Sequence, residues 1–277
     1  MNNRRNFFWI LAAIALAAAI GFAIHSQCTG VNALSWKVRV KIARQLEKPV
    51  RALTINDLPK VRHLALEDSI KFPAAAGPFI RDGKVVIHDR DLVHLDKLTG
   101  LQSFLLWYTQ DVSDAGMRHL SGLTSLRSLY LEDTKVTDAG VQHLAKLSAL
   151  TELHLVEANV TDAGVRIVTN MPAMQTLFLP KTQLTDEGLR YLTNLSGLQT
   201  LYLSYTKVTD AGLQHLMKLS ALESLSLADT RVTADGLRAL TNLPSLKSLL
   251  ISRTQVTAAE LKRLQAQLPN CSITLCL

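Results

Sequence analysis

The sequence predicts an α/β solenoid, with parallel strands on a concave face and helices on a convex face, preceded by a transmembrane helix. Three observations lead to this prediction. A 24-residue repeat runs in phase from Leu126, apolar and polar residues alternate at the start of each repeat, and an uncharged apolar run occupies residues 7–24. Repeats of roughly this length stack into solenoids, because a single repeat cannot bury its own apolar face.

The first element is the apolar run at residues 7–24, which contains 18 residues and no charge. This length just spans a hydrocarbon core, and no A-x-A-like cleavage site follows it, so a single-pass anchor is favoured over a cleaved signal peptide. Arg4 and Arg5, in the flank at residues 1–6, favour a cytoplasmic N-terminus and an extracytoplasmic body. Basic residues at 37–44 oppose that orientation, so the favoured localisation is a single-pass membrane protein whose orientation stays open.

Positive charge is concentrated before the repeats. The chain of 277 residues contains Lys+Arg 30 and Asp+Glu 23, a net charge of +7. Residues 1–62 hold ten of the basic groups and two of the acidic ones, whereas residues 63–277 hold 20 basic and 21 acidic groups. A body that is nearly neutral excludes a general basic surface for a phosphate backbone, so we expect no nucleic-acid partner.

The basic segment at residues 25–57 connects the anchor to the repeats. Apolar residues recur at i+4 spacing beside a stripe of Lys and Arg, which predicts an amphipathic helix over 34–48 that ends before Pro49. Two interpretations are open for this helix. It lies on anionic lipid headgroups, or it caps the end of the repeat domain.

Residues 58–277 form the predicted repeat domain, in which six regular units follow one another from Leu126. A longer unit of 25 residues starts at Leu101, and strand-like pieces start at Val61 and Lys84. The domain is therefore expected to contain roughly eight to ten strands.

Each regular unit has the pattern LxxLxLxxTxVTDAGLxxLxxLxx, here described for the unit that starts at Leu126. The alternating stretch predicts a strand with Leu129 in the core and Tyr130 on the concave face. Thr137 suits a helix N-cap, and Asp138 places negative charge at the helix start. Gly140, in the first helical turn, is expected to allow the close approach of neighbouring helices.

This pattern resembles the leucine-rich repeat. It is most similar to the TDAGL-type units of ribonuclease-inhibitor-like and F-box-associated solenoids, which also occur in bacterial membrane-anchored repeat proteins. The resemblance covers residues 61–277 and implies a leucine-rich-repeat solenoid that binds a protein partner. The sequence departs from the family in having Thr134 and its equivalents where Asn or Cys is frequent, and no segment resembles an F-box.

The concave strand face is the expected binding surface, because curved solenoids bind through it. One column of this face is predicted to run through Ala65, Leu105, Tyr130, His154, Phe178, Tyr202, Ser226 and Leu250. Leucine fills the core, so aromatic residues on the exposed face indicate interface anchors. The candidate binding residues are Trp107, Tyr108, Tyr130, Glu132, Asp133, Glu152, His154, Glu157, Phe178, Tyr202 and Tyr205. Their acidic members favour a basic protein partner, whereas the competing interpretation is that strand aromatics simply pack on one another across the sheet.

The predicted function is therefore that of a membrane-anchored, non-catalytic protein-binding module, with the bilayer contacted through residues 7–24. We expect no enzymatic activity, cofactor or metal, and neither nucleotide-binding glycine loops nor a GxSxG elbow occurs. One alternative is a metal-dependent enzyme at His88–His94, where His and Asp residues recur, although a polar capping turn is the favoured interpretation of that segment. Another is a structural envelope or adaptor protein, including a substrate adaptor like the F-box-associated repeat proteins.

Overall fold

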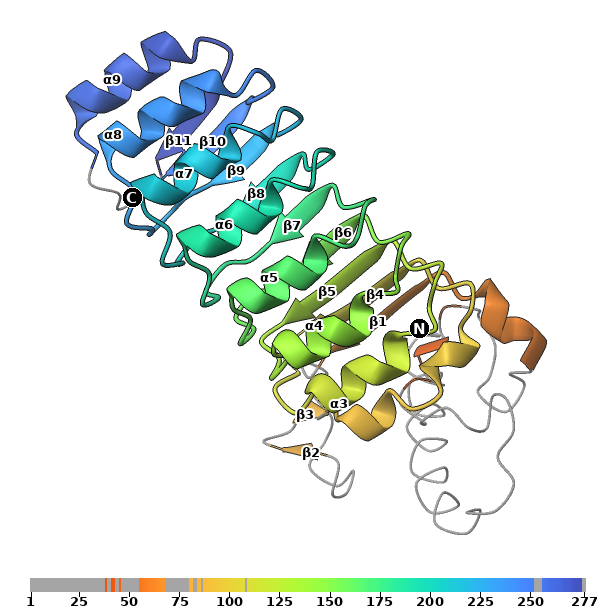
Figure 1. Cartoon of the computed structure of the whole chain (residues 1–277). Helices are drawn as coiled ribbons and strands as arrows, with labels where there is room; N and C mark the ends of the chain where they lie inside the picture. The colour runs from red at the N-terminus through yellow and green to blue at the C-terminus, as the bar shows by residue number, and fades with distance from the viewer. Residues whose placement is uncertain are drawn as a thin grey trace, which may run out of the picture.

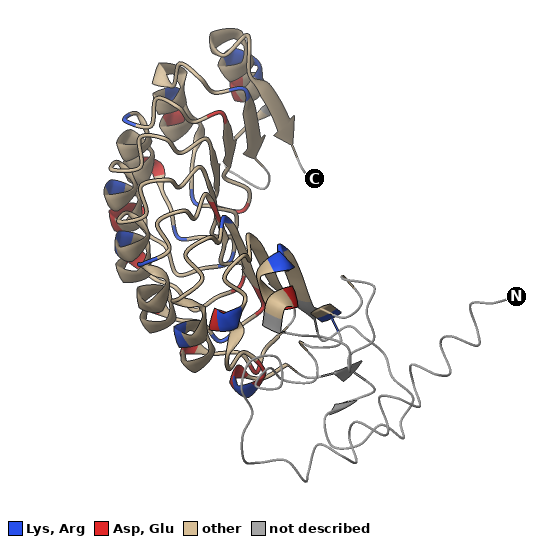
Figure 2. Cartoon of the chain, turned by 90° about the vertical axis from the view of Figure 1, so that its right-hand side faces the viewer, with Lys and Arg blue, Asp and Glu red and all other residues tan. Residues whose placement is uncertain are grey.

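The structure, a computed structural model, describes residues 38, 41, 42, 45, 55–67, 80–81, 84–85, 87–107, 109–251 and 256–275. In this part of the chain, nine parallel strands form one open sheet in the order β1-β4-β5-β6-β7-β8-β9-β10-β11. Helices cover the outer side of this sheet (Figure 1). Figure 2 shows the stack curving so that strands line the concave side and helices lie on the convex side. The predicted α/β solenoid is confirmed.

The strands occupy the same position in successive repeats. They are β1 (His63–Glu67), β4 (Ser103–Trp107), β5 (Ser128–Glu132), β6 (Glu152–His154), β7 (Thr176–Phe178), β8 (Thr200–Tyr202), β9 (Ser224–Ser226), β10 (Ser248–Ile251) and β11 (Ser272–Leu275). The register pairs Leu105 with Tyr130, Tyr130 with His154, and so on to Leu250. The concave column predicted from the sequence is therefore confirmed. Leu129 and Leu131 point the other way and are fully buried.

Helices follow the strands on the convex side. The α-helices are α3 (Asp114–Met117), α4 (Asp138–Leu144), α5 (Asp162–Val168), α6 (Asp186–Leu192), α7 (Asp210–Leu216), α8 (Ala234–Leu237) and α9 (Ala258–Gln267). Shorter 3-10 helices are η3 (Ile55–Lys60), η4 (Asp89–Asp91), η5 (Leu95–Lys97), η6 (Arg118–Leu120) and η7 (Arg238–Asn242). The predicted N-cap is confirmed in α4, where Thr137 Oγ1 accepts a hydrogen bond from Ala139 N at 3.2 Å.

The aspartate that starts each of the helices α3 to α7 also binds the next repeat. Asp138 Oδ1 accepts from Thr161 N at 2.8 Å, and Asp138 Oδ2 accepts from Thr161 Oγ1 at 2.6 Å. The same pair of hydrogen bonds joins six successive junctions, a series we call the carboxylate ladder. Its pairs are Asp89–Ser113, Asp114–Thr137, Asp138–Thr161, Asp162–Thr185, Asp186–Thr209 and Asp210–Thr233.

The glycine in the first helical turn makes room for this carboxylate. A Cβ atom built at Gly164 would lie 2.4 Å from Asp138 Oδ1, which is far inside van der Waals contact. The same clash would occur at Gly140 with Asp114 and at Gly212 with Asp186. The sequence predicted a role in helix approach, and the structure assigns the space more specifically to the aspartate side chain of the preceding repeat.

Two residues before the repeats belong to the hydrophobic core. Val38 and Ile42 are helical, fully buried and part of the same hydrophobic core as the repeat leucines. This burial favours the capping interpretation of residues 34–48 over a position on lipid headgroups. The strand-like piece at Lys84 forms β3 (Lys84–Val85), which pairs with β2 (Ile80–Arg81) in a separate two-stranded antiparallel sheet.

The predicted membrane anchor at residues 7–24 lies outside the described residues, as does the flank at residues 1–6. Of the residues that the structure does describe, none belongs to a helix long and apolar enough to cross a membrane.

Candidate functional site

Four of the predicted binding residues form one continuous stack on the concave face, which we call the ring column: Tyr130, His154, Phe178 and Tyr202. Their ring centroids are 4.1, 4.0 and 4.2 Å apart in succession, and the last two pairs lie within 9° of parallel. The stack arises because in-register parallel strands repeat about every 4.8 Å, close to the spacing of stacked rings. The sheet therefore brings together residues that are 24 positions apart in the sequence.

Glu152 supports one end of the ring column. Its Oε1 lies 3.0 Å from His154 Nε2, and its carboxylate also accepts from the Tyr130 hydroxyl. Burial and this hydrogen bond raise the pKa of Tyr130 to about 12. Burial lowers the pKa of His154, with Glu152 opposing the shift. Burial alone would raise the pKa of Glu152, but hydrogen bonds from His154, Ser128 and Tyr130 lower it. At neutral pH the Tyr130 and His154 side chains are therefore uncharged. The ionised Glu152 carboxylate accepts hydrogen bonds from both of them.

A second column follows the strands at the turn, and we call it the turn column: Asp133, Glu157, Lys181, Tyr205 and Asp229. All five residues have left-handed backbone conformations, with φ between 52° and 59°. Asp133 accepts from Gln110 Nε2 at 2.8 Å, and Glu157 forms an ion pair with Lys181. The Lys181 ammonium lies 5.9 Å from the centroid of the Tyr205 ring. The predicted acidic residues Asp133 and Glu157 therefore lie beside the ring column.

Tyr205 is the one aromatic residue of the turn column, and it is exposed. Its exposed fraction is 52 %, the highest among the large apolar residues that the structure describes. Bulky residues are rare in the left-handed region, which Asn, Asp and Gly tolerate better. The turn geometry thus disfavours tyrosine at this position, while the ring remains open to a ligand.

Of the remaining predicted binding residues, the structure describes Glu132 fully and Trp107 only in its backbone. Glu132 ends β5 and is half-buried, and Trp107 ends β4 opposite it. The Trp107 side chain and the whole of Tyr108 lie outside what the structure describes. Ser226, which the sequence placed in the concave column without a binding role, is fully buried, and its hydroxyl oxygen lies 2.7 Å from that of Ser204. At this repeat the concave column therefore has a small polar residue in place of a ring.

The segment from His88 to His94 is engaged in structural contacts. Asp89 belongs to the carboxylate ladder through Ser113, and Asp91 Oδ2 accepts from His88 N at 3.0 Å at the start of η4. Within the described residues, no three His, Cys, Asp or Glu side chains are arranged to hold a metal ion. These contacts favour the polar capping turn over the metal site.

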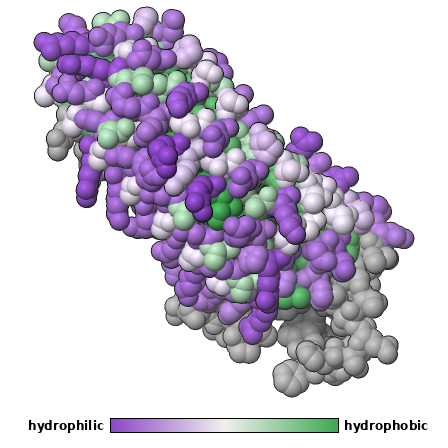
Figure 3. All heavy atoms as spheres, in the orientation of Figure 1, coloured by the Kyte–Doolittle hydropathy of each residue, from purple (hydrophilic) through white to green (hydrophobic). Residues whose placement is uncertain are grey.

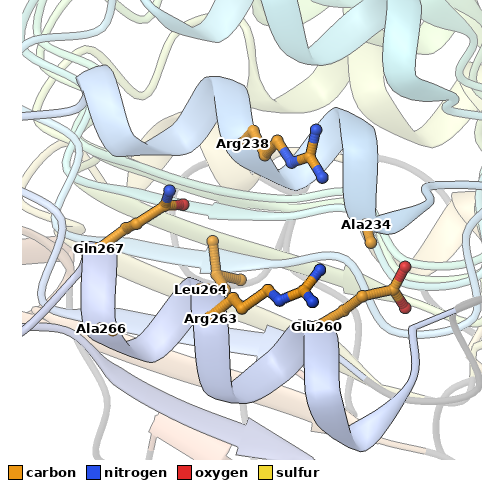
Figure 4. A pocket seen from close by; sticks show the side chains of 7 residues that line it. All are labelled: Ala234, Arg238, Glu260, Arg263, Leu264, Ala266 and Gln267. Carbon is orange, nitrogen blue, oxygen red and sulfur yellow. The ribbon is translucent and has the colours of Figure 1, made fainter.

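A groove opens on the helix side where the carboxylate ladder stops. Ala234 replaces the ladder aspartate, and Thr257 instead forms a capping box with Glu260 of its own helix. The groove between α8–η7 and α9 has a volume of about 350 Å³, and Arg238 and Arg263 extend toward the end where Glu260 lies (Figure 4). Arg238 pairs with Asp235 at 3.1 Å. The groove lining thus holds two basic side chains and one acidic side chain, and Asp235, which is outside the lining, pairs with one of the arginines.

The rest of the helix-covered face is mostly hydrophilic, with only small apolar areas between polar side chains (Figure 3). Its column of Arg118, Gln142, Arg166, Arg190, Gln214 and Arg238 is exposed to solvent. In Arg190 the guanidinium is paired with Glu187 one helical turn earlier. This face has the character of a solvated surface.

Comparisons with known proteins agree with this geometry. A family model described as "Leucine Rich repeat" matches residues 122–145 and 196–217, each of which spans a Thr-Asp-Ala-Gly motif. The solved structure of internalin C2 from Listeria monocytogenes superimposes with a TM-score of 0.67 at 22 % identity, over 91 % of this chain and 98 % of that one. The chain is a leucine-rich repeat protein. At this level of identity the internalin shows that the leucine-rich repeat fold is shared, and no more.

Two further comparisons add little to this assignment. A leucine-rich repeat protein of Leptospira interrogans matches with a TM-score of 0.49 and 19 % identity, over 68 % of this chain and 51 % of that one. No curated protein matches the chain.

Proposed function

We propose that this leucine-rich repeat chain is a non-catalytic module that binds a protein partner through its concave face. The observation that supports the proposal most directly is Tyr205, a large exposed ring held in a backbone conformation that disfavours it. It lies in the turn column next to the ring column, so the two together form a surface several strands long. Aromatic residues in such positions are typical anchors of protein interfaces.

The charge of this surface favours a partner with basic residues. Glu132, Asp133 and Glu157 lie along the first half of the face, with Lys181 as the opposing charge in the turn column. Complementary charge speeds association and selects among partners more than it adds affinity. The near-neutral repeat domain offers no comparable surface for nucleic acid.

We further propose that residues 7–24 anchor the chain in a membrane with the repeats on the extracytoplasmic side. The support is the length of the uncharged run and the two arginines that precede it. A reporter that is active on only one side of the membrane, fused after Leu277, tests the orientation. Activity only in the cytoplasm would reject an extracytoplasmic body, and recovery in the soluble fraction would reject the anchor.

Site-specific photocrosslinking in the full-length chain tests the concave face. A photoreactive phenylalanine analogue is placed at Phe178 or Tyr205, and at Tyr191 of α6 as the matched position on the helix side. We expect a discrete protein adduct from the first two positions and none from the third. An adduct of equal yield at Tyr191, or no adduct at either concave position, would contradict the proposal.

A single substitution then separates binding from folding. Tyr205→Asn removes the exposed ring while keeping a residue that tolerates the left-handed conformation. We expect the crosslinked partner to be lost at position 178 while the thermal midpoint does not fall. Arg166→Ala, on the exposed helix side, is the control and should leave the adduct unchanged.

A further inference from the structure

The two inner rings of the ring column, those of His154 and Phe178, present their edges, and not their faces, to the concave surface. His154 lies between Tyr130 at 4.1 Å and Phe178 at 4.0 Å, and Phe178 lies between His154 and Tyr202 at 4.2 Å. Both faces of the two inner rings are therefore covered by their neighbours. What remains accessible on these half-buried side chains is the edge that points away from the sheet.

This geometry narrows the ligands that the two inner rings can recognise. The face of an aromatic ring is electron-rich and its edge is electron-poor. Ammonium cations and nucleobases bind to open faces, and the inner rings have none to offer. Sugars that pack their C–H groups on aromatic platforms need the same open faces. An electron-poor edge instead suits the face of another aromatic ring in an edge-to-face arrangement.

We infer that the ring column receives an aromatic side chain of a protein segment, with the face of that side chain against the edges of His154 and Phe178, and a neighbouring Lys or Arg of the segment at the acidic side chains. This inference rests on the proposed function and specifies the chemistry of the partner.

The basic residue of the partner is expected at acidic side chains that do not already bind the rings or a lysine of this chain. Glu152 is engaged by His154 and Tyr130, and Glu157 by Lys181. Asp133 accepts only from the neutral amide of Gln110 among the hydrogen bonds described, and Glu132 lies next to it on the same strand end. The basic residue is therefore expected at Asp133 and Glu132, one strand from the centre of the ring column.

Selection from a random peptide library on the immobilised protein tests this chemistry, with a glycan array probed in parallel. We expect selected peptides to be enriched in Trp, Tyr or Phe close to Lys or Arg, and no glycan to bind.

Three variants then locate the binding site of the selected peptides. Phe178→Leu keeps an apolar side chain but removes the ring edge, and we expect it to lower the affinity for the selected peptides by about 5- to 10-fold. Asp133→Asn should also lower the affinity for the peptides. The affinity of this variant should depend less on salt than that of the wild type, because salt screens an exposed charge pair. Tyr191→Leu on the helix side is the matched control and should change neither the peptide affinity nor its salt dependence.

The outcomes separate this inference from the proposed function. Peptides that depend on Tyr205 but show no aromatic enrichment and no response to Phe178→Leu would overturn the inference and leave the proposed function standing. Glycan binding that is lost in Phe178→Leu, or the absence of any peptide that depends on the concave face, would overturn both. Thermal unfolding of each variant verifies that a loss of binding is not a loss of fold.

Discussion

The carboxylate of Asp138 binds both the backbone N–H and the hydroxyl group of Thr161 in the next repeat, at 2.8 and 2.6 Å. Thr161 is the N-cap of α5, so the start of α5 is held both by its own N-cap side chain and by the carboxylate of the preceding repeat. Hydrogen bonds to a carboxylate are stronger than neutral ones. The Thr-Asp-Ala-Gly motif is therefore an inter-repeat connector as well as a helix start.

Removing one carboxylate from the middle of the ladder should destabilise the fold. Asp162→Ala leaves the Thr185 N–H and hydroxyl without their charged acceptor in a partly buried place. We expect a loss of about 2–4 kcal/mol in the free energy of unfolding, measured by urea denaturation. Asp235→Ala is the control, because its carboxylate is 80 % exposed and outside the ladder, and it should change stability by less than about 0.5 kcal/mol.

Replacing a ladder glycine by alanine should also destabilise, against the ordinary helix preference. Alanine is usually better than glycine inside a helix by about 0.5–1 kcal/mol. A Cβ at Gly236, however, would lie 2.1 Å from Asp210 Oδ1, so Gly236→Ala is expected to cost about 1–3 kcal/mol. Gly197→Ala meets only a carbonyl oxygen at 3.9 Å and serves as the neutral control.

The clash at Gly236 can be assigned to Asp210 by a double-mutant cycle. Asp210→Ser shortens the side chain that occupies the space, so adding Gly236→Ala to it should cost less than the same change in the wild type. Strictly additive unfolding free energies would show that the carboxylate is not the cause.

The ladder should be extendable by one repeat. Ala234→Asp together with Glu260→Gly recreates at α8 and α9 the residue pair found at the other junctions. We expect slower amide hydrogen exchange in α9, because its N-cap Thr257 becomes tied to the preceding repeat. Ala234→Asp alone should give little protection, since Glu260 already occupies the Thr257 donors and a side chain stands where the glycine is needed.

Tyr205→Asn should not lower stability, and is expected to raise the free energy of unfolding by up to about 1 kcal/mol, because asparagine adopts the left-handed conformation more readily. Chemical denaturation of the two proteins measures the difference. A clear loss of stability would mean that the Tyr205 ring has a packing role, and would weaken its assignment as a binding anchor.

Acidification below the ordinary pKa of histidine should destabilise the ring column. Burial lowers the pKa of His154 below its usual value of 6.5 in the folded state, so the unfolded chain binds the proton more readily. The contribution of neutral His154 is thus present above pH 6.5 and is lost as the pH falls through the lowered pKa. Between about pH 7.5 and about pH 5.5, the free energy of unfolding should fall more for the wild type than for His154→Phe, which keeps a stacked ring. Equal slopes for the two proteins would contradict this expectation.

The sequence by itself determined the strand and helix of each repeat. The alternation at Leu129, Tyr130 and Leu131 follows from the two-residue period of a strand, and Thr137 follows from the unsatisfied N–H groups of a helix start. Because the units repeat without insertion from Leu126, the register of the concave column could also be deduced, and with it the candidate binding residues.

Only the tertiary structure decided what these residues do to one another. The hydrogen bonds that Thr161 donates to Asp138, and the space that Gly164 leaves for that aspartate, depend on how far apart two stacked repeats lie, which no local pattern encodes. The stacking of Tyr130, His154 and Phe178 depends on the strand spacing and on side-chain rotation in the same way. Burial of Val38 and Ile42 favours one of the two interpretations that the amphipathic pattern left open, because an apolar stripe has the same spacing whether lipid or protein covers it.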